Sequence, residues 1–253
     1  MRTDNRGAVS TAMQQLGLMI QWQLRRITDA LPLLVILQIM LAVATIAGYG
    51  LLVGNPDRLA ELYLATGAPT TTLITVGLVL VPQLVSRARL EGSLDWLRTL
   101  PVPREMYLFS DLAVWTIIAL PGLIVGIIAG SIRFGVELTP TLWLIPIAFL
   151  VSLTAASIGY ALTLLLSPTV AQLASQVLVF TILLFTPISF PPERMPDWAQ
   201  QIHSWLPLQP MAEAMRSALL PNEFSVSTRS WVVLLIWCVA SLAAAEWSLR
   251  RRG

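Results

Sequence analysis

The sequence has almost none of the residues from which most catalytic and metal sites are built. It contains one cysteine, Cys238, and one histidine, His203, and all sixteen of its basic residues are arginine. A single cysteine in an apolar run excludes a disulfide framework and a cysteine metal cluster. Without lysine, neither a phosphate-binding loop of the G-x-x-x-x-G-K-[ST] type nor a lysine Schiff base can form. Any work driven by ATP therefore requires another chain to hydrolyse it.

Charge of either sign is also scarce. Only 12% of the 253 residues are charged and 56% are hydrophobic, with a mean hydropathy of +0.73. Because soluble domains carry about 25% charged residues, this composition predicts an integral membrane protein. At about 20 apolar residues per span, the length allows about six spans and leaves no room for a sizeable soluble domain. We expect membrane lipid, and no nucleic acid, among its partners.

The hydrophobic runs predict an all-α fold with one transmembrane domain over residues 1–253. The six expected spans are 31–53, 67–85, 112–132, 142–166, 171–190 and 231–249. Before them, residues 11–29 have an apolar stripe at helical spacing, with Trp22 and Arg25-Arg26 beside it. This pattern favours a helix lying in the headgroup layer, and an ordinary surface helix is the alternative. The segment 191–229 is amphipathic and punctuated by proline.

The arginines are divided unequally between the two sides of the membrane. Six spans put both termini on one side, and loops on that side carry eleven arginines against five on the other. Positive charge collects in cytoplasmic loops, so both termini and the loop 86–107 are expected in the cytoplasm.

Charged residues are missing from the middle of every expected span. This absence argues against a proton- or ion-coupled carrier, which usually keeps a charged or histidine relay in the membrane. It also leaves no catalytic constellation and no metal site, so we do not expect an enzyme. Amides and hydroxyls remain, and they could line a path for an amphipathic substrate or bond to neighbouring helices. The candidates for the path are Gln38, Thr45, Thr75, Gln176 and Thr181.

Three glycines lie four residues apart in the third expected span. Gly122, Gly126 and Gly130 fall on one helix face and allow another helix to approach closely. Helix packing within the chain is the favoured interpretation, and a contact between subunits is the alternative.

One densely charged run, Arg87 to Tyr107, interrupts the apolar sequence. It holds four arginines and three acids, and residues 91–100 can form a short amphipathic helix. Pro101 and Pro103 would end that helix and stiffen its link to the next span. The run is expected to dock a separate motor protein, and a solvated charge cluster is the alternative.

Two stretches together resemble the membrane subunits of ABC-2-type transporters, the six-helix ABC exporter permeases. The first is Arg89-Leu-Glu-Gly-Ser-Leu followed by Leu97 and Leu100-Pro101, with Ser93 where threonine is commoner in the family. The second runs from Pro187 through Pro196-Asp-Trp to Leu206-Pro207 and Arg216, with Leu206 where asparagine is usual. The resemblance covers essentially the whole chain.

The resemblance implies a role for each stretch. The first would be a coupling helix in a cleft of an ABC ATPase subunit, formed by Arg89, Glu91, Gly92, Asp95, Leu97, Arg98 and Pro101. The second would be an extracytoplasmic gate, with short re-entrant helices in segment 191–229. The gate would include Pro187, Pro196, Trp198, Pro207 and Arg216. ATP and Mg²⁺ would bind the partner ATPase, with no cofactor in this chain.

The resemblance also implies an assembly and a location. Two permeases, the same chain or different chains, would pair across the first and fifth spans in a bacterial plasma membrane. The complex would export an amphipathic small molecule, as in multidrug efflux, or a lipid. A carrier that works without an ATPase and a non-transporting assembly subunit remain the alternatives.

Overall fold

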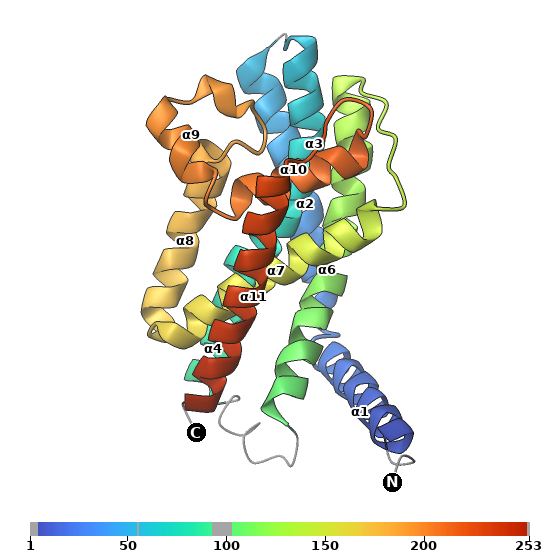
Figure 1. Cartoon of the computed structure of the whole chain (residues 1–253), viewed down its shortest axis with the longest axis vertical. Helices are drawn as coiled ribbons and strands as arrows, with labels where there is room; N and C mark the ends of the chain where they lie inside the picture. The colour runs from blue at the N-terminus through green and yellow to red at the C-terminus, as the bar shows by residue number, and fades with distance from the viewer. Residues whose placement is uncertain (1–4, 55, 93–102, 252–253) are drawn as a thin grey trace.

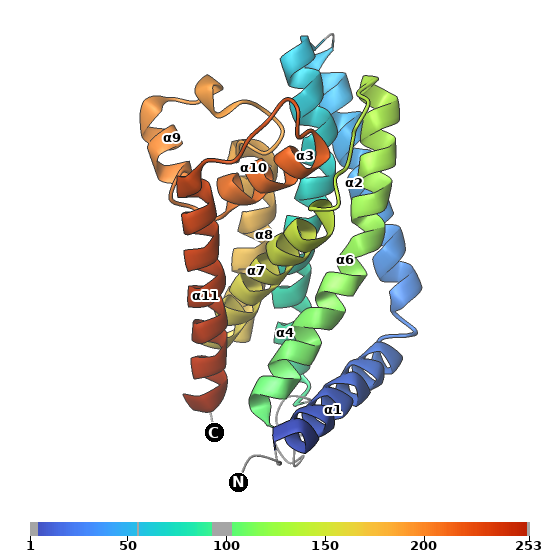
Figure 2. The same ribbon diagram turned by 45° about the vertical axis from the view of Figure 1, so that its right-hand side comes forward.

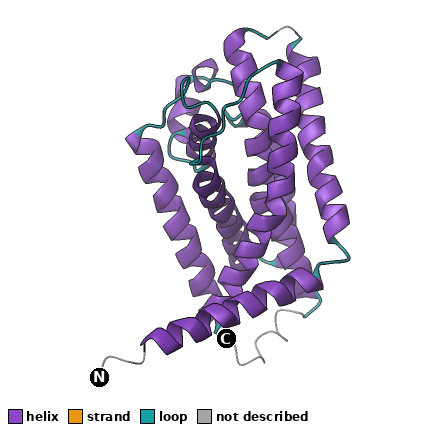
Figure 3. Ribbon diagram, turned by 90° about the vertical axis from the view of Figure 1, so that its right-hand side faces the viewer, coloured by secondary structure: helices purple, strands orange, loops and turns teal. Residues whose placement is uncertain are grey.

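The structure, a computed structural model, describes residues 5–54, 56–92 and 103–251. The described chain is helical and contains no strand (Figure 3). Six helical stretches within it are long and apolar enough to cross a membrane, which confirms the predicted fold class. They are α2 (Leu31–Val53), α3 (Arg58–Thr75) continued through the π-helical turn η1 (Val76–Leu80) into α4 (Val81–Leu90), α6 (Arg104–Phe134), α7 (Leu144–Leu165), α8 (Pro168–Phe185) and α11 (Thr228–Arg251).

The first and last described residues lie at the same end of the bundle (Figure 1). We call this the terminal end, and the opposite one the far end. The terminal end also carries the end of α4 and the start of α6, which flank residues 93–102. The far end carries the turn between α2 and α3 and the short helices between α8 and α11.

The continuous stretch α3–η1–α4, here called the central rod, lies at the middle of the bundle. In its most apolar window 94% of the residues are buried, and α2, α6, α7 and α10 all contact α3. Its threonines satisfy their hydroxyls within the helix: Thr66 and Thr70 each donate to the carbonyl four residues earlier, at 2.8 Å. The rod therefore needs no polar partner from another helix at these positions.

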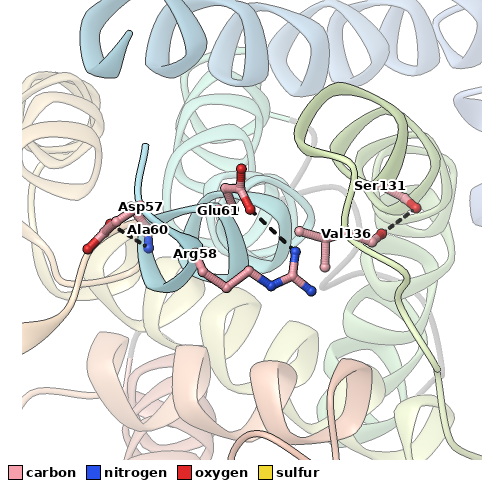
Figure 4. A network of polar contacts seen from close by, with 6 residues as sticks. All are labelled: Asp57, Arg58, Ala60, Glu61, Ser131 and Val136. Atoms are coloured by element: carbon pink, nitrogen blue, oxygen red, sulfur yellow. Dashed lines mark hydrogen bonds and ion pairs between the residues drawn. The ribbon is translucent and has the colours of Figure 1, made fainter. Parts of the chain in front are cut away.

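The far-end start of the rod lies well before residue 67, where the sequence placed it. The Asp57 carboxylate accepts a hydrogen bond from the Ala60 amide at 3.1 Å, which caps the helix at Arg58 (Figure 4). Arg58 also pairs with Glu61 at 3.3 Å. Nearby, the end of α6 is closed by the Ser131 hydroxyl, which donates to the Val136 carbonyl at 2.7 Å.

Two other boundaries also differ from the expected ones. Helix α6 begins directly after Pro103, two turns before the expected start at residue 112. Helix α8 ends at Phe185 rather than at residue 190. Thr186 takes an extended conformation because it precedes Pro187, and a residue before proline is disfavoured in the helical region.

The glycine stripe of α6 lies against the central rod. A β-carbon at Gly126 would stand 2.7 Å from the Cα of Pro69, and one at Gly130 would stand 2.7 Å from the Ala65 carbonyl oxygen. A β-carbon at Gly122 would overlap the side chain of Thr72 on α3. The stripe therefore allows α6 and α3 to pack with their backbones in near contact.

Helix α7 crosses the rod obliquely at the π-helical turn η1 (Figure 2). A β-carbon at Gly77 would overlap the backbone of Ala156, and one at Gly159 would overlap the Gly77 carbonyl oxygen. The turn comes directly before Pro82, which has no amide hydrogen and clashes with the carbonyl of Leu78 in a regular helix. The wider turn accommodates that proline without breaking the rod.

Helix α1 (Asn5–Arg26) lies across the terminal end of the bundle and packs on α6 (Figure 3). Its partly buried Ile20 and Leu24 pack against the core, whereas Leu18 is exposed. The helix is six residues longer at its start than the expected 11–29 and is followed by a turn into α2. The expected position of this helix in the headgroup layer stays a prediction.

Three short helices lie at the far end between α8 and α11 (Figure 1). They are η2 (Pro192–Arg194), α9 (Asp197–His203) and α10 (Leu208–Leu219). Helix α10 is buried against α3, α7 and α11, with Met211, Met215 and Leu219 fully enclosed.

We predict that Gly126→Ala lowers the stability of the folded chain. The new β-carbon would meet the Pro69 backbone, and overpacking of this kind costs about 1–3 kcal/mol. Thermal unfolding in detergent would show a lower Tm than wild type. Gly17→Ala is the matched control, because a β-carbon at Gly17 meets nothing within 4 Å. An unchanged Tm for Gly126→Ala would contradict the close packing of α6 on α3.

Candidate functional site

The predicted coupling residues fall at the terminal end, where α4 stops. Arg89, Glu91 and Gly92 are described by the structure, whereas Asp95, Leu97, Arg98 and Pro101 lie outside the described residues. The predicted helix 91–100 lies outside them as well, except for its first two residues, which form the turn that ends α4.

Glu91 and Gly92 end α4 in a defined way. The Glu91 amide donates to the Arg87 carbonyl at 3.0 Å, and the Gly92 amide donates to the Arg89 carbonyl at 3.3 Å. Gly92 has a φ of +73°, in the left-handed region that glycine adopts at the end of many helices. Glu91 is exposed. The glycine ends the helix and leaves the glutamate accessible.

Arg89 turns inward and binds the end of α7. Its Nη1 donates to the Leu166 carbonyl at 2.9 Å and also to the Thr163 carbonyl. Both carbonyls belong to the last turn of α7, where backbone oxygens lack helical partners and the helix dipole favours a cation. Arg89 therefore joins the end of α4 to α7 and the turn into α8.

Arg250 makes the corresponding connection on the other side of the loop. It bonds to Glu246 of its own helix α11 at 2.6 Å and also to Glu105 in the first turn of α6. The pair with Glu246 has the i,i+4 spacing typical of helical ion pairs, whereas the pair with Glu105 spans 145 residues and has no sequence signal. All three side chains are exposed, so the pairs fix geometry more than they stabilise the fold.

A buried polar contact joins α1 to α6. The Gln23 amide lies 2.6 Å from the Ser110 hydroxyl and 2.5 Å from the Asp111 carboxylate. Both contacts are satisfied when the amide nitrogen donates to Asp111 and the amide oxygen accepts from Ser110. Sequence reasoning did not find this contact, because Gln23 and Ser110 are 87 positions apart.

The predicted gate residues have different surroundings. Pro196 and Pro207 directly precede α9 and α10, whereas Pro187 lies in the turn after α8 and is buried. Trp198 is exposed on α9. Arg216 on α10 is buried, with only 3% of its surface exposed.

Arg216 is held between backbone and aromatic rings. Its Nη2 donates to the Ile188 carbonyl at 2.8 Å, and its guanidinium carbon lies 3.8 Å from the Tyr63 ring centre and 5.4 Å from that of Phe224. Burial lowers the pKa of Arg216 from 12.5 to about 10, so it stays charged at neutral pH. The contacts attach α10 and the turn after α8 to the start of the central rod.

Comparison with known protein families decides the identity of this helical arrangement. Residues 53–246 match the family model described as ABC-2 family transporter protein, which is most of the chain. The chain belongs to the ABC-2 transporter family. It is a multi-pass permease, the membrane component of a transporter and not a catalytic subunit. No curated protein matches the sequence.

The predicted path residues of this permease do not converge on one place. Gln38 is buried, donates to the Ile118 carbonyl at 2.6 Å and accepts from the Gly122 amide at 3.2 Å, so it joins α2 to α6. The Thr45 and Thr181 hydroxyls bond to carbonyls of their own helices. Thr75 is buried in the central rod, and Gln176 is exposed on α8. No hydrogen bond joins any two of these five described residues.

Two spans of the permease leave most of their surface uncovered. In the most apolar windows of α2 and α8, only 28% and 17% of the residues are buried. The exposed side chains include Leu33, Ile36 and Met40 on α2 and Leu173, Val177 and Phe180 on α8.

Arg89→Met is predicted to destabilise the permease by about 1–3 kcal/mol. Methionine keeps much of the side-chain volume but leaves the Thr163 and Leu166 carbonyls without their cationic donor. The Tm in lipid nanodiscs should fall. Arg58→Met is the control, because Arg58 makes only an exposed pair with Glu61. Equal Tm values for the two variants would mean that Arg89 does not hold α7.

For Arg216, we predict that lysine is a worse replacement than methionine. Lysine keeps the cost of burying a charge but cannot reproduce the planar contact with Tyr63, whereas methionine removes the charge. The Tm should fall by more in Arg216→Lys than in Arg216→Met. The opposite order would contradict the role of the planar guanidinium.

Proposed function

We propose that this permease exports an amphipathic small molecule or a lipid, driven by a separate ABC ATPase that docks on the loop 86–107. The observation that carries this proposal is the geometry at the end of α4. Glu91 is exposed there, while the neighbouring Arg89 holds the same turn to α7. One side of the turn is thus open to a soluble partner, and the other is fixed to the spans.

The contacts beside the loop 86–107 would pass a movement of the docked ATPase to the helices. Arg89 joins its start to α7, Arg250 joins its other side to α11, and Gln23 joins α6 to α1. A displacement of the loop would therefore move several helices together. ATP and Mg²⁺ would stay on the ATPase.

The distribution of arginine supports a cytoplasmic position for the terminal end. Eleven of the sixteen arginines belong to the termini and to the loop 86–107. By the positive-inside rule this end would face the cytoplasm of a bacterial plasma membrane, where an ATPase has access to ATP. The far end, with α9 and α10, would then face outward.

The uncovered surfaces of α2 and α8 support a pair of permeases. Lipid-facing helices are apolar as well, but these two spans have the lowest buried shares of the six, followed by α11 at 39%. A second copy, or a related permease, would pack on them and enclose the substrate path. The path would be weakly polar, because most hydroxyls in the described spans bond to their own helix. Such a path suits a drug-like molecule or a lipid better than a large glycan.

The test is a reversal of charge at the docking turn. Glu91→Arg should abolish transport-linked ATP hydrolysis while leaving membrane insertion intact, because the residue is exposed and its carboxylate bonds to no other described residue. The measurement is ATPase activity in material purified with the permease in mild detergent. Glu137→Arg, an exposed change at the far end, is the matched control. Normal transport-linked ATPase activity in Glu91→Arg would refute docking at this turn.

A further inference from the structure

A cavity of about 220 Å³ lies at the terminal end between α1, α2, α4 and α6. One wall is apolar and includes Ile27, Leu34, Leu84, Val114 and Trp115. No sequence pattern indicates this cavity, because its lining comes from four helices that are distant in the chain. None of the functions described above uses it.

The polar part of the lining carries an excess of negative charge. Two carboxylates, Glu91 and Asp111, face one guanidinium, Arg87. Asp111 is bound to Gln23, which also lines the cavity. Glu91 is exposed, and no hydrogen bond or ion pair joins its carboxylate to another described residue. A cation in the cavity would therefore find one carboxylate held in place and one available.

An aromatic group completes the site. Trp115 is only 6% exposed, and its Nε1 has no hydrogen-bond partner among the residues that the structure describes. A buried polar group without a partner is unusual, and because the indole N–H can only donate, it points to a water or an acceptor oxygen beside it. Tyr107 adds a second ring to the lining. Aromatic faces attract ammonium groups, most strongly in a desolvated pocket.

We propose that this cavity binds the head of an amphiphile that carries a positively charged nitrogen. The carboxylates and rings would hold the nitrogen, and the apolar wall would hold the first carbons of the tail. The volume suits a head group and a short length of chain and is smaller than most pockets for whole drug-sized molecules.

The position of the cavity suggests its consequence. Arg87, Ala88 and Glu91 line it from the end of α4, and Tyr107 and Asp111 line it from the start of α6. An occupant would touch both ends of the coupling loop and would signal its presence to the ATPase. This consequence rests on the function proposed above, whereas binding of the ammonium head does not.

Binding is therefore tested on the full-length permease alone, without an ATPase, in nanodiscs of phosphatidylglycerol. The probe is radiolabelled dodecyltrimethylammonium, with dodecyl sulfate as a competitor that has the same tail and an anionic head. We expect saturable binding that dodecyl sulfate does not displace. Glu91→Gln should weaken it about fivefold, as expected for one partly solvated charge contact. Glu137→Gln, at the far end, should leave it unchanged.

A second variant tests the cavity itself. Ala88→Leu should fill part of the space and lower binding by at least as much as Glu91→Gln. Binding that is non-saturable, or equal in wild type, Glu91→Gln and a monodisperse Ala88→Leu sample, would overturn the proposal. Because the assay contains no ATPase, this failure is separate from any failure of Glu91→Arg to uncouple ATP hydrolysis.

The source of the ammonium head is resolved by adding phosphatidylethanolamine to the nanodiscs. Weaker probe binding in these nanodiscs would assign the site to a bilayer lipid, whose head group carries a primary ammonium. Equal binding would assign it to a free amphiphile. Both results support an ammonium site, because the probe would already have bound in nanodiscs of phosphatidylglycerol, a lipid that has no amine of its own.

Discussion

Close backbone contact with the central rod is the constraint on which the rest of the structure depends. Between helices in lipid there is little hydrophobic driving force, so association relies on packing and on satisfied polar groups. Gly126 lies over Pro69, and Gly159 lies over Gly77, where a β-carbon would clash. These contacts bring α6 and α7 onto the rod and leave α2 and α8 at the outside of the chain, with most of their surface uncovered.

The same rod connects the two ends of the permease. Near its start, Tyr63 packs under the buried guanidinium of Arg216 from the far-end helices. Near its other end, Arg89 binds the last carbonyls of α7. A close-packed core is not easily deformed along its length, so displacement at one end is passed on unless a joint absorbs it. The π-helical turn η1 is such an irregularity, and it lies where α7 crosses the rod.

Sequence reasoning succeeded where the signal is local. Apolar runs predicted six spans, and four-residue spacing placed three glycines on one helix face. It could not identify the partners of isolated polar residues, because those partners are set by tertiary packing. Gln38 illustrates the limit: an amide in an apolar helix needs a partner, but only the structure places that partner on α6. Likewise, the motif containing Arg89 predicted a docking surface, whereas its side chain binds α7.

The surroundings of the polar side chains also bear on where a substrate would pass. Within the described chain, Gln38 and Thr45 are already bonded, and Thr75 is enclosed in the rod. Gln176 differs, because it is exposed on α8, the least covered span. A path through the middle of one permease would have to break the packing of the central rod. A path between two permeases, along α2 and α8, would leave that packing intact and would bring Gln176 to its wall.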